Sequence, residues 1–141
     1  MKFSKSPSKN SKEALKIKNL WNKNEAKILK EIKNLNGLNT STKNISCKID
    51  SDTAHGFYGY DNITLGIKGG ISKDDALMVI THELFHIFYW RKVRSLKLSK
   101  GTLGKEKSWE WALAEATAYI LQNEKSIKIF RLLHAIGSTI I

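Results

Sequence analysis

The sequence has one cysteine, Cys47, and one proline, Pro7, among its 141 residues. A single cysteine excludes an intrachain disulfide framework and a zinc site built from several thiolates. No stretch approaches the roughly 20 apolar residues of a membrane span. The polar start of the chain has no apolar segment of the kind found in secretory signals. We therefore expect a cytoplasmic protein whose metal site, if it has one, uses histidine and carboxylate ligands.

Arginine is scarce too. The positive side chains behind the net charge of +11 are 21 lysines and only three arginines. Residues 1–34 hold ten lysines and three glutamates, so 10 − 3 = +7 of this charge lies in the first quarter of the chain. Such a region favours nucleic acid, an anionic membrane surface or an acidic partner, although many lysine runs are only solvated. The shortage of arginine argues against base readout.

The order of patterns along the chain predicts one α+β domain over residues 12–141, preceded by a flexible basic tail over residues 1–11. Apolar residues recur every three or four positions from Ala14 to Leu35, which predicts a long amphipathic helix that stops at Asn36-Gly37. Residues 45–49 alternate between apolar and polar, and segments 57–60 and 63–67 read as two more short strands. Several glycines, Gly56 among them, mark turns or close approaches of the backbone in this region.

Three further helices are expected after the strands. Ser72 and Asp75 have the spacing of a capping box, and the apolar run behind them predicts a buried helix over residues 73–96. A second helix, over residues 109–123, begins after Ser108 and is rich in alanine, which permits close packing on a neighbour. A last helix is expected over residues 124–136.

Residues 82–86 read His-Glu-Leu-Phe-His and lie within the expected buried helix. Residues four apart on a helix are neighbours, so His82 and His86 can bind one ion through their imidazoles. Glu83 is rotated by roughly 100° from His82, so it is poorly placed as a ligand but can reach a water bound to the metal. This pattern predicts a zinc site with Glu83 as general base. Ions that neighbour zinc also suit such ligands.

A catalytic zinc site needs a third protein ligand. A third histidine would have to stand at position 92, which is Lys92. The candidates are then Glu106, Glu110, Glu115, His55 and His134. Glu115 is favoured, because it lies in the middle of the alanine-rich helix and 115 − 86 = 29 residues after the second histidine. Glu110 stays open as the alternative, near the helix start where an acid is also explained by the helix dipole.

With these residues the chain resembles the gluzincin metallopeptidases, the thermolysin-like clan that combines His-Glu-x-x-His with a downstream glutamate. The matching segments are 79–86 and 115–118, and in size the chain is similar to the minigluzincins. The resemblance implies a minimal single-domain zincin, with a small mixed sheet packed on a buried metal-binding helix. It also implies zinc-dependent hydrolysis of peptide bonds, with residues 60–65 as the edge strand that binds an extended peptide.

The chain departs from that family at two points. Many gluzincins carry an aspartate four residues after the glutamate ligand, where this chain has Tyr119. There is no room for the large C-terminal subdomain that supplies a transition-state-stabilising histidine, so His134 or Tyr119 is the candidate oxyanion donor. The alternative function is a zincin-like regulatory protein with little or no peptidase activity, whose basic N-terminal region contacts DNA.

Overall fold

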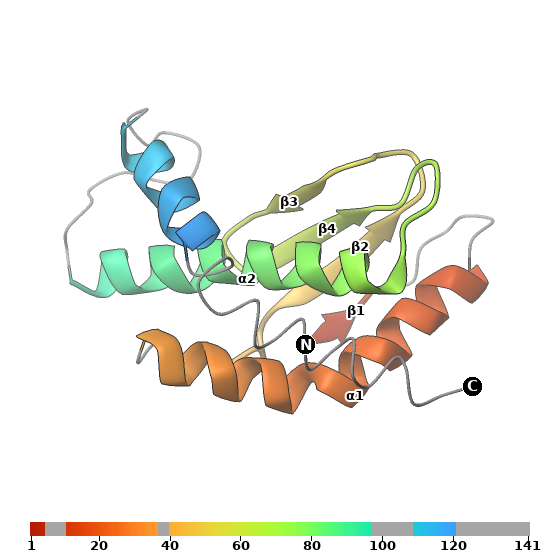
Figure 1. Cartoon of the computed structure of the whole chain (residues 1–141), viewed down its shortest axis with the longest axis horizontal. Coiled ribbons are helices and arrows are strands. Elements are labelled where there is room, and N and C mark those ends of the chain that lie inside the picture. The colour runs from red at the N-terminus through yellow and green to blue at the C-terminus, as the bar shows by residue number, and fades with distance from the viewer. Residues whose placement is uncertain (5–10, 37–39, 97–108, 121–141) are drawn as a thin grey trace.

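The computed structural model describes residues 1–4, 11–36, 40–96 and 109–120. These residues form an α+β fold with a small mixed sheet of four strands and three helices (Figure 1). Helix α1 (Ser11–Asn36) and helix α2 (Lys73–Ser95) lie side by side, and a further helix over residues 109–120 lies across one end of α2. The predicted α+β class is confirmed.

The sheet has the order β1-β2-β4-β3, which places β4 in its interior. Strands β1 (Lys2–Phe3), β2 (Ser46–Asp50) and β4 (Asn62–Gly66) are parallel. Strand β3 (Gly56–Tyr58) runs antiparallel to β4 and forms one edge. Strand β3 is therefore an edge strand, and it also contacts α2.

In the described residues, helices cover one face of the sheet (Figure 1). Cys47 and Ile49 of β2 are buried on that face and pair with buried residues of β4. Gly56 and Tyr58 pair with Leu65 and Ile63 of β4, so they share this covered face and point toward α2. The core consists of apolar side chains from α1, β2, β4 and α2, including Ile17, Trp21, Ile28, Ile32, Leu77, Ile80, Leu84 and Phe88.

Helix α2 follows from its sequence more fully than any other element. The Ser72 hydroxyl caps it by accepting a hydrogen bond from the Asp75 amide at 3.0 Å. Asp74 and Asp75 lie in its first turn and Arg94 in its last, as the helix dipole favours. Apolar side chains are buried around most of its circumference, which confirms the expected central helix.

Two expectations need correction. The resemblance assigned a sheet edge to residues 60–65, but β4 is paired on both sides, and the edge next to it is β3, residues 56–58. Lys2 and Phe3, which we expected in a flexible tail, form β1 against β2, because their backbone groups pair there and the Lys2 amide also donates to the Ile45 carbonyl at 2.9 Å. The expected helix over residues 124–136 lies outside the described residues.

Candidate metal centre

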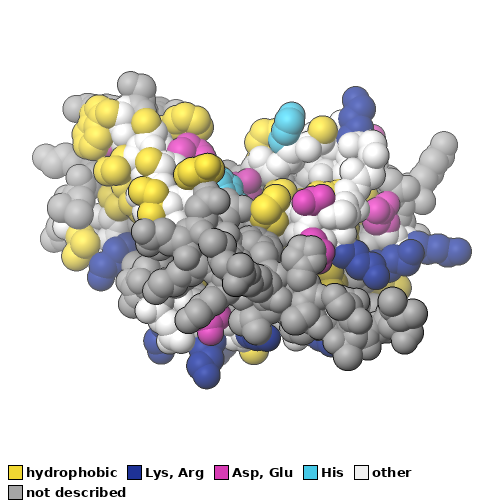
Figure 2. Space-filling view, in the orientation of Figure 1, with side chains coloured by type: hydrophobic (Ala, Val, Ile, Leu, Met, Phe, Trp, Pro, Cys, Tyr) yellow, Lys and Arg dark blue, Asp and Glu magenta, His cyan; other side chains and the backbone are white. Residues whose placement is uncertain are grey.

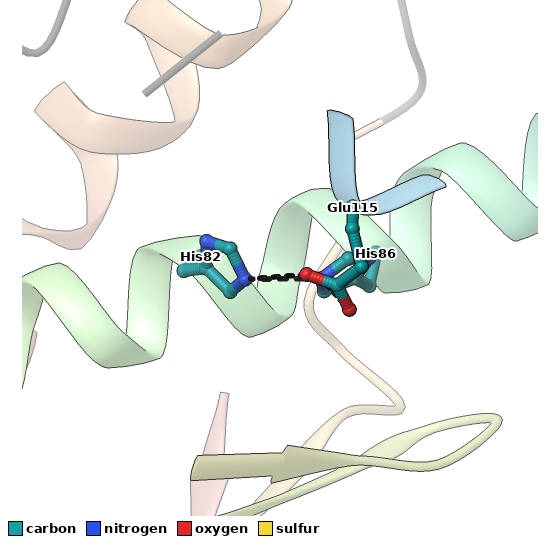
Figure 3. A group of neighbouring side chains, drawn as sticks. All are labelled: His82, His86 and Glu115. Atoms are coloured by element: carbon teal, nitrogen blue, oxygen red, sulfur yellow. Dashed lines mark hydrogen bonds and ion pairs between the residues drawn. The ribbon is translucent and has the colours of Figure 1, made fainter. Parts of the chain in front are cut away.

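Three predicted ligands meet at one point between α2 and helix 109–120. The Nε2 atoms of His82 and His86 lie 3.0 Å apart. The carboxylate of Glu115 lies 3.3 Å from His86 Nε2 through Oε1 and 3.6 Å from His82 Nε2 through Oε2. Figure 3 shows the two imidazoles one turn apart on α2, with Glu115 reaching them from the other helix. Of the described residues, these three form the group of donors that could hold a metal ion.

The spacing of these donors fits one small cation. Two ligand atoms about 2.0–2.1 Å from a tetrahedral ion lie roughly 3.3 Å from each other. The nitrogen–nitrogen distance of 3.0 Å and the distances of 3.3 Å to Glu115 Oε1 and 3.6 Å to Glu115 Oε2 lie near that value. One ligand atom from each of the three residues lies within 4.8 Å of the others. Two imidazoles and one carboxylate are also the ligand set of many catalytic zinc sites. The residues present therefore fit a zinc ion.

Burial keeps His86 in the form that binds metal. Its side chain is 1% exposed. Burial, together with a smaller effect of the neighbouring His82, lowers its pKa from 6.5 to about 4. His86 is therefore neutral at pH 7, and a neutral imidazole has a lone pair for a metal.

Glu83 lies next to the two histidines but is not one of the three converging donors. It is 7% exposed, and burial raises its pKa to about 7. The Glu115 carboxylate raises the pKa of Glu83 as well, while His82 opposes the change. A carboxyl group with a pKa near 7 can accept and return protons at neutral pH.

Strand β3 forms a wall along this group. A Cβ atom on Gly56 would lie 2.5 Å from Glu83 Oε1, so the carboxylate of Glu83 occupies the space that any larger residue would need. The ring of Tyr58 stacks on His86 with ring centroids 4.5 Å apart. Figure 2 shows histidine and acidic side chains at the base of a hollow between two lobes of the surface.

The structure separates the remaining candidates from this group. His55 is exposed, and Glu110 lies on helix 109–120 without joining the three donors. Burial raises the pKa of Tyr89, and the charge of Glu110 raises it as well. Tyr119 is on the same helix and 67% exposed. Its role as an oxyanion donor stays a prediction. Glu106 and His134 lie outside the described residues.

Sequence reasoning missed Tyr58 and Trp90, and it noted Gly56 only as one of several glycines. The alternation of Gly56, Phe57 and Tyr58 was a signal for a strand, and a glycine within a strand is a signal for close approach of another group to the backbone. Neither signal names the residue on α2 that each would meet. That depends on how β3 lies along the helix.

Comparison with protein-family models, curated proteins and solved structures found no match. No helix among the described residues has the length and apolar character needed to cross a membrane.

Proposed function

We propose that this chain is a zinc metallopeptidase that hydrolyses peptide bonds with an activated water. The observation that supports it best is the convergence of His82, His86 and Glu115 on one point, with Glu83 buried beside them. A structural pair of core histidines would not need a carboxylate from a separate helix at 3.3 Å. Nor does packing alone explain the buried carboxyl group of Glu83 next to them.

Each residue has a distinct task in this proposal. His82, His86 and Glu115 would hold the ion. When bound, zinc lowers the pKa of a water molecule and polarises the substrate carbonyl. Glu83 accepts a proton from the attacking water on a carboxylate oxygen and then delivers it to the leaving amine. The raised pKa of Glu83 suits both transfers, because the carboxylate and the carboxylic acid are similar in free energy near pH 7.

The position of β3 supports a peptide as the substrate. In the described residues its backbone pairs on one side with β4, and its other side is the sheet edge. An extended peptide can add to such an edge through backbone hydrogen bonds. Because Gly56 adjoins Glu83 and Tyr58 adjoins His86, a peptide paired to β3 would run past the proposed catalytic group.

Metal analysis tests this function directly. Purified wild type should bind one zinc per chain and cleave an unstructured protein such as casein. Glu115→Ala should lose both properties, while the matched variant Glu110→Ala, on the same helix, should retain both. Loss of metal from Glu110→Ala alone would overturn the ligand assignment, and a wild type without affinity for zinc would overturn the function.

A second function is favoured by the surface of α1. Five exposed lysines lie within about 60° of its circumference and span about 27 Å along its axis, given 3.6 residues per turn and a rise of 1.5 Å. This lysine stripe consists of Lys12, Lys16, Lys23, Lys27 and Lys30. None of the five forms an ion pair with a described residue.

The stripe faces away from the core, which α1 contacts through Ile17, Trp21, Ile28 and Ile32. Figure 2 shows lysine and arginine side chains along the edge where Figure 1 places α1. A row of lysines that pair with no acid in the described part of the chain matches a phosphate backbone and requires no base contacts. We propose that α1 binds nucleic acid without sequence preference, and that it recruits the peptidase there.

A further inference from the structure

The second imidazole of the proposed site lacks a usual hydrogen-bond partner. If His86 binds a metal through Nε2, the proton of the neutral ring lies on Nδ1. In most metal sites that N–H donates to a carboxylate, a carbonyl or a water, which fixes the orientation of the ring. Here His86 Nδ1 is buried and has no hydrogen-bond partner in the described part of the chain.

A different contact holds the ring of His86. The ring of Tyr58 lies nearly parallel to it, with an angle of 14° between the planes and 4.5 Å between the centroids. His82 contacts it from another direction, edge to face at 78°. A flat ring stacked on an imidazole resists rotation of the imidazole about its Cβ–Cγ bond, because rotation would drive the ring edge into the aromatic face.

Tyr58 is itself held from two sides. Its backbone belongs to β3, in register with Ile63 of β4. Its hydroxyl accepts a hydrogen bond from Trp90 Nε1 at 3.2 Å. Trp90 lies one turn beyond His86 on α2 and is buried. The side chain of Tyr58 on the edge strand therefore contacts two residues of the same helix, His86 by stacking and Trp90 by a hydrogen bond.

We propose that Tyr58 is the positioning residue for His86, and that its stacked ring orients this ligand in place of a hydrogen-bonded partner at Nδ1. The inference rests on the proposed metal site. It makes the edge strand part of the support of the metal centre, since the strand that would pair with substrate also fixes a ligand. A hydrogen-bonded carboxylate would add negative charge near the ligand, whereas the aromatic ring orients it without a charge.

Zinc affinity, measured by competition with a chelator, tests the proposal. Tyr58→Leu keeps an apolar side chain but removes the flat ring, so we expect zinc to bind at least about tenfold more weakly, as for the loss of other outer partners of a ligand. Tyr58→Phe keeps the ring and should remain within about threefold of wild type, because stacking does not need the hydroxyl. Phe57→Leu is the matched control on the opposite face of β3, where Phe57 is 53% exposed, and should bind zinc as wild type does.

Two spectroscopic measurements separate positioning from a loss of stability. The visible absorption spectrum of the cobalt-loaded protein should change in Tyr58→Leu and stay unchanged in Tyr58→Phe, at a temperature where both are folded. In wild type, the His86 ring protons should show an upfield ring-current shift that Tyr58→Phe retains. If Tyr58→Leu does not fold, Tyr58→Met provides the same comparison with an unbranched chain.

Equal zinc affinity in wild type and a folded Tyr58→Leu would overturn the inference and leave the proposed function standing. Absence of the upfield shift in wild type would overturn it as well. If wild type binds neither zinc nor cobalt, the proposed function fails and this inference fails with it.

Discussion

The carboxylate of Glu83 lies against the backbone of Gly56, so closely that a Cβ atom there would be 2.5 Å from Oε1. That Cβ would also lie 2.5 Å from Cγ1 of Val79, one turn earlier on α2. Both atoms are ends of side chains that can move, so Gly56→Ala should fold with Glu83 displaced. Gly56 thus leaves the space in which the proposed base is held.

We predict that Gly56→Ala binds zinc normally but cleaves casein on the order of 100-fold more slowly, because a displacement of about 1 Å in a catalytic group can cost that much. The matched control is Gly59→Ala, which crowds the Asn62 side chain instead of Glu83. Zinc titration and kcat measurements on both variants check the prediction. Full activity of Gly56→Ala would show that the position of Glu83 does not limit the reaction.

Glu83→Gln separates metal binding from catalysis. Glutamine has nearly the same shape as glutamate but cannot accept the proton of the attacking water, so activity should fall by about 100-fold or more. Zinc content should stay near one per chain, because Glu83 is not among the three converging donors. Cleavage at the wild-type rate by a zinc-loaded Glu83→Gln protein would remove Glu83 from the mechanism.

In the metal-free protein, the buried groups Glu83 and His86 should make the free energy of unfolding depend on pH in opposite directions. Glu83 has a pKa near 7 in the fold and an ordinary value of 4.5, so its contribution is present below pH 4.5 and is lost as the pH rises to 7. His86 has a pKa near 4 in the fold and an ordinary value of 6.5, so its contribution is present above pH 6.5 and is lost as the pH falls to 4. The two contributions have opposite signs over nearly the same pH range, so each masks part of the other in the wild type.

Glu83→Gln should expose the His86 contribution. Its free energy of unfolding, measured in urea without metal, should rise between pH 4 and 6.5 more steeply than that of wild type. The double variant Glu83→Gln/His86→Asn is the control and should lose this rise. A parallel pH dependence in wild type and Glu83→Gln would contradict burial of the two groups as the cause.

The contribution of the lysine stripe to DNA binding can be distinguished from that of the net charge. Lys16, Lys23 and Lys27 changed to Gln should weaken binding to duplex DNA and reduce the slope of log K against log salt by up to about 2.7, at roughly 0.9 per phosphate contact. The control has the same net charge, with Gln at Lys18, Lys43 and Lys68, which are exposed off the stripe. Equal losses in both triple variants would mean that the overall charge, not the stripe, attracts DNA.

The elements around the proposed site could be predicted to different degrees. Helix α2 carries its own signals, a cap at Ser72 and an apolar circumference, so its bounds could be predicted almost to the residue. His82 and His86 then follow from helix geometry, and Glu115 follows from its place among alanines. All of these depend on local periodicity.

The edge strand was misassigned because the place of a strand in the sheet depends on contacts between residues that are far apart in the sequence. Residues 62–66 alternate in the same way whether they form an edge or an interior strand, and only parallel pairing with β2 places them inside the sheet. Strand β1 has two residues, too few to show a period. The stack of Tyr58 on His86 depends on how β3 lies along α2, which no local pattern specifies.

Helix 109–120 enters the core through its smallest side chains, since Ala114 and Ala118 are buried while Trp109, Leu113 and Ile120 remain exposed. Two alanines remove little apolar area from water, so the packing seen among the described residues attaches this helix only weakly. A cation bound by Glu115 and both histidines would then cross-link the helix to α2 and hold it more firmly than its packing does. Chelation would accordingly release this helix first, and hydrogen exchange of its amides would report the presence of the ion before any change in the sheet.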